Sequence, residues 1–251
     1  MTSDPHDDAH PATNPDTNPD AHPDATRVAA PAPDGATARE HELRAHWHRT
    51  VLAAGAAPDR DPAPYADRLL TAWAEPQREY HTTAHLADVL ARIDVLAEHA
   101  EDPAAVRLAA WFHDAVYRPD RSENEERSAA LAERALPELG VGDARTAETA
   151  RLVRLTVTHN PAPGDTNGEV LCDADLAVLA GTPQAYAAYA ASVRAEYGFV
   201  PDEAFRAGRA AVLRQLLDLP RLFRTPYGSA HWEAPARANL AAELTELSSH
   251  A

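Results

Sequence analysis

Two histidines and two aspartates, His85, His113, Asp114 and Asp175, lie near the ends of apolar segments in this 251-residue chain. Imidazole nitrogens and carboxylate oxygens are common ligands of divalent transition metals in proteins. Burying such a set is costly unless a cation compensates the carboxylates. The residue types therefore indicate a metal site, whose open coordination positions would accept water and a phosphate oxygen.

The segments around these residues are expected to be helices. His85 lies at the margin of a stripe with helical spacing, formed by Leu86, Val89, Leu90, Ile93 and Leu96. His81 precedes His85 by one helical turn and is expected to face much the same space. Residues 106–117 are apolar nearly all round, which predicts a central buried helix that carries His113 and Asp114 near its end.

Several further motifs accompany the four residues in a fixed order. In that order, 28 positions separate His85 from His113 and 61 separate Asp114 from Asp175. The accompanying motifs are Arg78-x-Tyr80-His81-x-x-x-His85, Trp111-Phe-His-Asp-Ala-Val-Tyr117, Asn124-Glu125-Glu126-Arg-Ser128, Thr158-His159 and Asp173-Ala-Asp-Leu-Ala-Val-Leu179. From about Glu40 to the C-terminus the chain resembles the HD superfamily of metal-dependent phosphohydrolases, and within it a bacterial group of predicted HD phosphohydrolases.

The resemblance implies a role for each matching residue. His85, His113, Asp114 and Asp175 would bind a divalent cation. Asp173 would support this ligand set without binding the cation itself. The helix that carries His81 and His85 is also similar to the corresponding helix of cyclic-nucleotide phosphodiesterases, where the earlier histidine protonates the leaving group. On that analogy His81 is the general acid. Histidine titrates near neutrality, which suits that role at cellular pH.

Phosphate recognition would depend on arginine, because the chain contains no lysine. Arg78 adjoins the His81 turn and Arg118 follows His113-Asp114 by about one turn, so both are candidates for substrate binding, and Arg78 is also a candidate catalytic residue. The alternative is that each is a solvated surface charge; this interpretation fits Arg118 equally well but is weaker for Arg78, which belongs to the matched motif. His159, Glu125 and Asp173 are candidates for a second metal or for contacts behind the first, although a histidine at a helix exit or a glutamate in a first helical turn also has a capping role.

Three functions fit these residues. The first, which we favour, is a metal-dependent phosphohydrolase that cleaves a phosphoester of a nucleotide or another small phosphorylated metabolite with metal-activated water. The second is an HD-type di-iron oxygenase, and the third is a metal-stabilised binding protein without turnover. Mixed nitrogen and oxygen ligands do not distinguish Mn, Mg, Co, Ni, Fe and Zn.

Composition limits the partners. The net charge of −16 divides into about −6 for residues 1–38 and about −10 for the remainder, which argues against a nucleic-acid duplex as an obligate partner. A small phosphorylated substrate stays compatible. The single cysteine, Cys172, excludes an internal disulfide, and the chain shows no targeting or membrane-spanning run, so we expect a cytoplasmic protein that does not enter a membrane. The oligomeric state stays open.

The expected fold is all-α: an HD-type helical bundle with additional helices on its C-terminal side. Residues 1–38 hold seven prolines and seven aspartates and almost no large apolar residue, so they are expected to form a disordered acidic tail before a single helical domain over 39–251. The sequence predicts helices over 38–54, 65–74, 82–99, 103–114, 124–139, 143–158, 173–179, 183–197, 202–217 and 233–247. Breaks are expected where Pro and Gly cluster, at 161–164 and 167–168.

Overall fold

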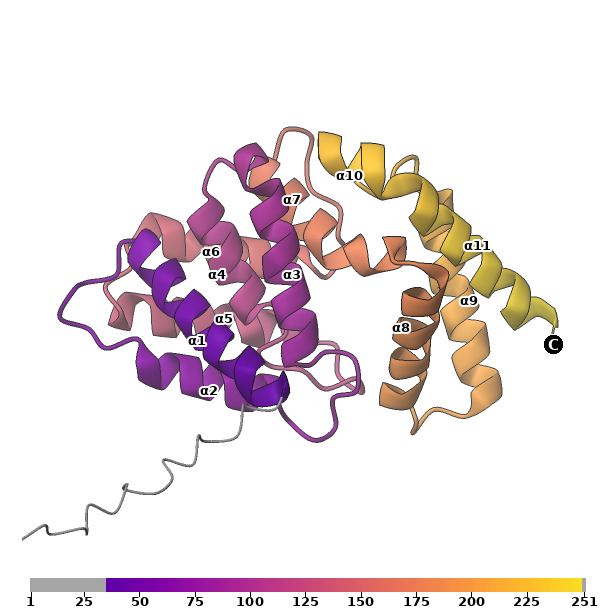
Figure 1. The fold of residues 1–251 in the computed structure, drawn as a ribbon, viewed down its shortest axis with the longest axis horizontal. Coiled ribbons are helices and arrows are strands. Elements are labelled where there is room, and N and C mark those ends of the chain that lie inside the picture. Colours follow the sequence, from indigo (N-terminus) through magenta and orange to yellow (C-terminus); the bar gives the residue numbers. More distant parts are fainter. Residues whose placement is uncertain (1–34, 250–251) are drawn as a thin grey trace, which may run out of the picture. The chain divides into compact units, whose positions relative to one another are not determined.

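The computed structural model describes residues 35–249, and these residues form helices and connecting segments with no strand (Figure 1). The expected all-α class is confirmed. The helices are α1 (Gly35–Ala53), α2 (Ala63–Trp73), α3 (Thr83–Leu96), α4 (Pro103–Phe112), α5 (Asn124–Glu138), α6 (Asp143–Leu155), α7 (Thr166–Leu176), α8 (Pro183–Glu196), α9 (Asp202–Asp218), α10 (Pro226–His231) and α11 (Glu233–Ser249). Two short 3-10 helices, η1 (Ala97–His99) and η2 (Ala177–Ala180), follow α3 and α7. The predicted tail lies outside the described residues up to position 34, and α1 begins at Gly35, three residues before the expected start.

Helix α4 is the centre of the N-terminal bundle. It contacts α1, α3, α5, α6 and α7, and all of its residues from Ala104 to Phe112 except Arg107 are buried. Asp102 caps its first turn by accepting hydrogen bonds from the amides of Ala104 and Ala105. Burial of each large side chain on α4 contributes roughly 1.5–3 kcal/mol. The prediction of a buried central helix is confirmed, and its C-terminal end is thereby fixed inside the protein.

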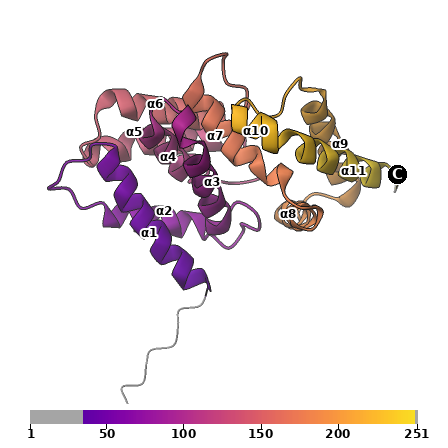
Figure 2. The same cartoon turned by 45° about the horizontal axis from the view of Figure 1, so that its top comes forward.

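The helices after α7 surround a second hydrophobic cluster. Phe223, Leu213 and Leu240 are fully buried there, and α11 packs against both η2 and α9. Figures 1 and 2 show these helices beyond α7, on the side of the N-terminal bundle where the chain leaves η2. The expected additional helices on the C-terminal side are therefore present.

The largest difference from the predicted elements concerns α7. It begins at Thr166, seven residues before the expected start, and includes Asn167 and Gly168, where a break was predicted. The Asp165 carboxylate accepts a hydrogen bond from the Gly168 amide and caps the helix. A Cβ on Gly168 would lie 2.7 Å from the Leu155 side chain, so this glycine permits close packing of α7 on α6. Helix α10 was not expected at all.

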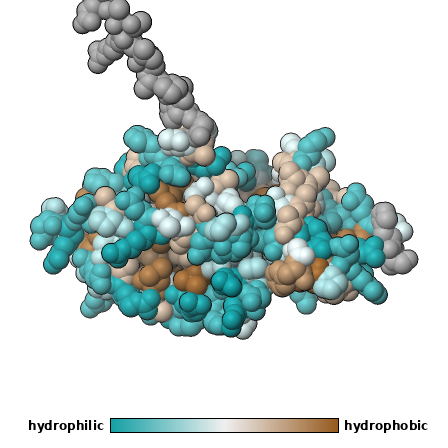
Figure 3. Space-filling view, turned by 90° about the horizontal axis from the view of Figure 1, so that it is seen from below, coloured by the Kyte–Doolittle hydropathy of each residue, from teal (hydrophilic) through white to brown (hydrophobic). Residues whose placement is uncertain are grey.

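Hydrophilic residues cover most of the face that Figure 3 shows, with small apolar areas between them. None of the helices within residues 35–249 is both long and apolar enough to cross a membrane.

Candidate metal centre

His85 enters the site from the first turn of α3. The Thr82 hydroxyl accepts a hydrogen bond from the Ala84 amide and caps this helix, which fixes where the first turn begins. The His85 side chain is buried. His81 lies in the turn just before α3, and its ring centroid is 5.6 Å from that of His85. The two imidazoles therefore face the same space, as the spacing predicts.

His113 and Asp114 follow the last residue of α4, and both are buried. The His113 Nδ1 lies 2.8 Å from the Ala110 carbonyl oxygen and donates a hydrogen bond to it. In the neutral imidazole, which is the form that binds a metal, this donation leaves the lone pair on Nε2, the nitrogen that faces the site. It is the usual way in which a protein orients a metal-binding histidine.

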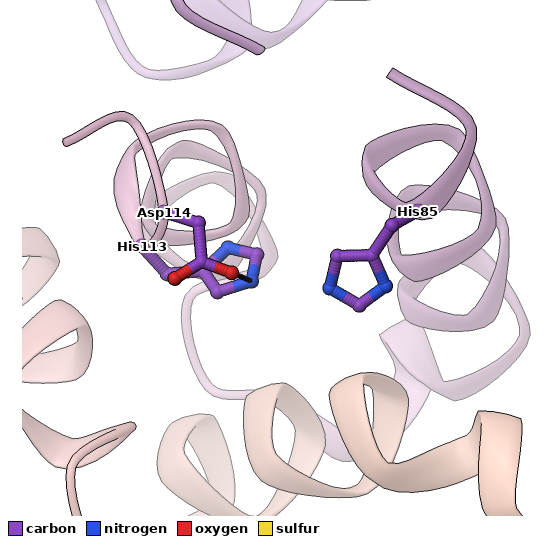
Figure 4. A group of neighbouring side chains, drawn as sticks. All are labelled: His85, His113 and Asp114. Carbon is purple, nitrogen blue, oxygen red and sulfur yellow. Dashed lines mark ion pairs between the residues drawn. The ribbon is translucent and has the colours of Figure 1, made fainter. Parts of the chain in front are cut away.

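One donor atom each of His85, His113 and Asp114 lies within 4.8 Å of the others, although the residues come from two helices (Figure 4). The Nε2 atoms of His85 and His113 are both buried, and neither forms a hydrogen bond. Each lies at ion-pair distance from a carboxylate oxygen, His85 Nε2 at 3.1 Å from Asp175 Oδ1 and His113 Nε2 at 3.2 Å from Asp114 Oδ2. Buried polar atoms without partners are rare in proteins and call for an explanation. A divalent cation bound between them would satisfy both nitrogens, so the residues present fit a metal.

Asp175 completes the candidate ligand set from the end of α7. Its Oδ1 lies 3.1 Å from His85 Nε2 and 3.7 Å from His113 Nε2. Asp173 points elsewhere: its carboxylate accepts hydrogen bonds from the Arg224 and Thr225 amides and from the Thr225 hydroxyl. Asp173 thus anchors the segment before α10, whereas Asp175 is the aspartate that approaches the histidines.

The carboxylates and imidazoles at this site stabilise one another's charged forms. Burial opposes the imidazolium of His113, but Asp114 and Asp175 outweigh it and raise the pKa of His113 to about 9. Burial likewise opposes ionisation of Asp114 and Asp175, yet the facing histidines hold the pKa of each carboxyl well below its ordinary value. The two carboxylates are therefore ionised at neutral pH and present two negative charges to a cation.

Of the three candidates for a second metal or supporting contacts, His159 approaches this ligand set. Its Nε2 lies 2.7 Å from Asp175 Oδ2, whereas His85 contacts the other oxygen of that carboxylate, Oδ1. His159 has a φ of 47°, a left-handed conformation that is uncommon outside glycine. Glu125 is half-buried in the first turn of α5 and forms no hydrogen bond or ion pair with the candidate ligands.

The two arginines expected to bind substrate are placed differently. The Arg78 side chain has no exposed surface; it donates hydrogen bonds to the carbonyl oxygens of His81 and Asp114 and pairs with Glu75. Its donors are thus occupied inside the protein, and Arg78 joins the His81 turn to the end of α4. The side chain of Arg118 is 59% exposed, with its closest ion-pair contact to Asp120 at 3.8 Å.

The motif after the His113-Asp114 pair also has a structural role. Asn124 exchanges hydrogen bonds with the backbone of Arg118. The Ser128 hydroxyl accepts from the Val116 amide and lies 3.3 Å from the Val116 carbonyl oxygen. These contacts hold the segment that leaves the site in a single conformation.

Sequence reasoning missed Glu196, the last residue of α8. Its buried carboxylate accepts hydrogen bonds from the backbone amides of Glu79, Tyr80 and His81 at 3.0–3.1 Å, and from the Tyr117 hydroxyl at 2.7 Å. Its Oε1 also lies 2.5 Å from His81 Nδ1. A signal was present, because Glu196 follows Tyr189 by seven residues and Val193 by three, and so shares one face of α8 with these two residues.

A cavity of about 380 Å³ lies against this site. His85, Asp175, Tyr80 and Tyr189 are among its lining residues. The Tyr80 hydroxyl is buried and has no hydrogen-bond partner. Burial, and after it the charge of Asp175, raises the pKa of Tyr80, so the hydroxyl stays protonated and is able to donate.

Comparison of the chain with protein-family models, with curated proteins and with solved structures gives no match.

Proposed function

We propose that the protein is a metal-dependent phosphohydrolase acting on a small phosphoester. The observation that carries the proposal is the pair of buried Nε2 atoms on His85 and His113, which have no hydrogen-bond partner and face the ionised Asp114. His85, His113, Asp114 and Asp175 would hold the cation. When bound, a divalent cation polarises a phosphoryl oxygen and lowers the pKa of a water molecule.

His81 is placed to act as the general acid. Its Nδ1 donates to the Glu196 carboxylate, and its Nε2 lies 3.9 Å from Asp114 Oδ2, on the side of the candidate ligands. Burial disfavours the imidazolium, but Asp114 and Glu196 outweigh it and raise the pKa of His81 above its ordinary value. His81 is therefore protonated more readily than an ordinary histidine, and in its protonated form it would hold a proton at Nε2 for the departing alkoxide. Such help is typically worth about 10²- to 10⁴-fold in rate.

Tyr80 would assist in binding the phosphoryl group. Its hydroxyl is neutral and unpartnered, and the same cavity wall carries Asp175 and His85. This hydroxyl would supply a hydrogen-bond donor to the phosphoryl group that neither Arg78, which is enclosed, nor Arg118, whose side chain is exposed, supplies.

The test is metal analysis of the purified protein, followed by a phosphate-release screen over nucleotides and sugar phosphates with the metal found. Asp114→Ala is compared with Asp59→Ala, an exposed aspartate outside the site. We expect metal-dependent phosphate release that Asp114→Ala abolishes and Asp59→Ala retains. Bound iron with oxygen consumption and no phosphate release would favour the oxygenase, for which the contact between His159 and Asp175 offers a starting point. Bound metal without either reaction would favour the binding protein.

A further inference from the structure

A second cavity, of about 480 Å³, lies between α8, α9 and the His81 turn. We call it the α8–α9 cavity. Its lining includes His81, Tyr189, Tyr197, Phe205, Gly208 and Val212. The volume is within the usual range of small-molecule sites, about 300–1,000 Å³.

The wall of the α8–α9 cavity is largely aromatic, and its one arginine is already paired with a carboxylate. Tyr197 and Phe205 lie with ring centroids 6.2 Å apart. Arg209 is the one arginine among the lining residues, and its guanidinium donates to both Glu243 carboxylate oxygens, at 2.8 and 2.9 Å. It also lies over the Tyr189 ring, 5.3 Å from its centroid. A phosphate would find no free arginine there, whereas a neutral apolar or flat group would pack well.

The cavity adjoins the general acid and not the candidate metal ligands. His81 is part of its lining, while His85 and Asp175 line the smaller cavity described above. Tyr80 and Tyr189 belong to both linings, with ring centroids 4.8 Å apart in an edge-to-face contact. The acid must contact the oxygen of the leaving group, so the organic part attached to that oxygen lies on the His81 side.

We infer that the α8–α9 cavity binds the alcohol portion of the substrate, and that this portion is apolar or aromatic and uncharged. The inference rests on the proposed hydrolase activity and narrows its substrate class to phosphoesters with an apolar leaving group. Esters whose alcohol carries further charge or only hydroxyl groups would lack compensating contacts in the cavity.

The experiment uses two esters of primary alcohols, benzyl phosphate and glycerol 3-phosphate, with the metal-loaded full chain. Burial of one aromatic ring predicts a ratio of kcat/KM of at least about tenfold in favour of benzyl phosphate. Gly208→Leu inserts a side chain into this space, because a Cβ at Gly208 meets no atom within 4 Å. Ala207→Leu adds the same side chain at an exposed neighbouring position of α9 outside the lining.

We expect the ratio to fall at least about tenfold in Gly208→Leu and to be retained in Ala207→Leu. Hydrolysis of both esters without preference, or a preference that survives Gly208→Leu, would overturn the inference and leave the hydrolase intact. If neither ester is hydrolysed, the binding of benzyl alcohol, measured by saturation-transfer NMR, tests the cavity independently of the hydrolase activity. If neither ester is hydrolysed but Gly208→Leu abolishes benzyl alcohol binding, the hydrolase fails and the apolar site stands; if benzyl alcohol does not bind either, both are refuted.

Discussion

The substitution Tyr80→Phe tests whether the Tyr80 hydroxyl contacts the substrate or stabilises the folded protein. The hydroxyl is buried and has no hydrogen-bond partner, and Tyr80 is one of the residues that line the cavity together with Asp175 and His85. Phenylalanine keeps the ring, whose centroid lies 4.7 Å from that of His85 and 4.8 Å from that of Tyr189. The substitution therefore removes one oxygen atom and leaves the packing of the site in place.

The expected effects on stability and activity have opposite signs. A buried hydroxyl without a partner costs about 1–3 kcal/mol, so its removal leaves the free energy of unfolding unchanged or raises it. If Tyr80 donates to a charged phosphoryl oxygen, the lost hydrogen bond is worth about 1.5–3 kcal/mol, which lowers kcat/KM roughly 10- to 150-fold. Because burial and Asp175 raise the pKa of Tyr80, the loss is the same across the neutral pH range.

Two measurements test this prediction. Urea unfolding of the metal-free protein gives the change in stability, and initial rates of phosphate release give kcat/KM. Tyr65→Phe is the matched control, since that hydroxyl bonds to Glu138 at a surface position away from the site. A clear loss of stability in Tyr80→Phe would show that the hydroxyl has a partner inside the folded protein. Unchanged kcat/KM would show that it does not contact the substrate.

Three further outcomes are expected. A divalent cation such as Mn²⁺ at about 100 times its Kd should raise Tm by roughly 5–10 °C over the EDTA-treated protein in calorimetry, and His85→Ala should abolish the shift. Burial opposes ionisation of Glu196, but its hydrogen bonds to His81 and neighbouring donors outweigh burial and lower its pKa to about 2, so the stability that it adds is complete above about pH 5 and is lost as pH falls toward 2. In urea unfolding, the free-energy advantage of wild type over Glu196→Gln should therefore shrink by about 3 kcal/mol across that range. A difference that stays constant with pH would contradict this expectation. Asp173→Ala should cost about 2–4 kcal/mol of stability through the lost bonds to Thr225 and keep the metal, whereas Asp175→Ala should lose it; metal lost from the Asp173 variant would contradict the assignment.

The burial of the segments that carry His85 and the His113-Asp114 pair was predictable because it depends on local signals, whereas their grouping into one ligand set came from the resemblance to a known family. His85 begins an apolar helix with a capping threonine, and His113 and Asp114 end a segment that is apolar all round. Such patterns determine which end of a helix is buried, whatever the details of packing. The approach of Asp175 to the histidines required the resemblance to a known family in addition, since periodicity does not separate Asp173 from Asp175.

The roles of Arg78, Glu196 and Gly168 depend on residues distant in sequence or on close packing. An arginine motif is compatible with phosphate binding and with hydrogen bonds to buried carbonyl oxygens, and only the position of the α4 end selects the second for Arg78. Glu196 lies 115 residues from its partner His81. Gly168 resembles a break in the sequence, yet it lies in a first helical turn, because α6 approaches there too closely for a Cβ.

The His81 turn is held from two opposite sides, and this gives α8 a part in the chemistry. From the bundle side, Arg78 donates to the carbonyl oxygens of His81 and Asp114, which ties the turn to the end of α4. From the C-terminal side, the Glu196 carboxylate accepts hydrogen bonds from three successive backbone amides and from the His81 Nδ1. A carboxylate with this many donors is costly to move. Because α8 also forms a wall of the α8–α9 cavity, a shift of this helix would, under the proposed mechanism, alter both the orientation of His81 and the shape of the proposed leaving-group site.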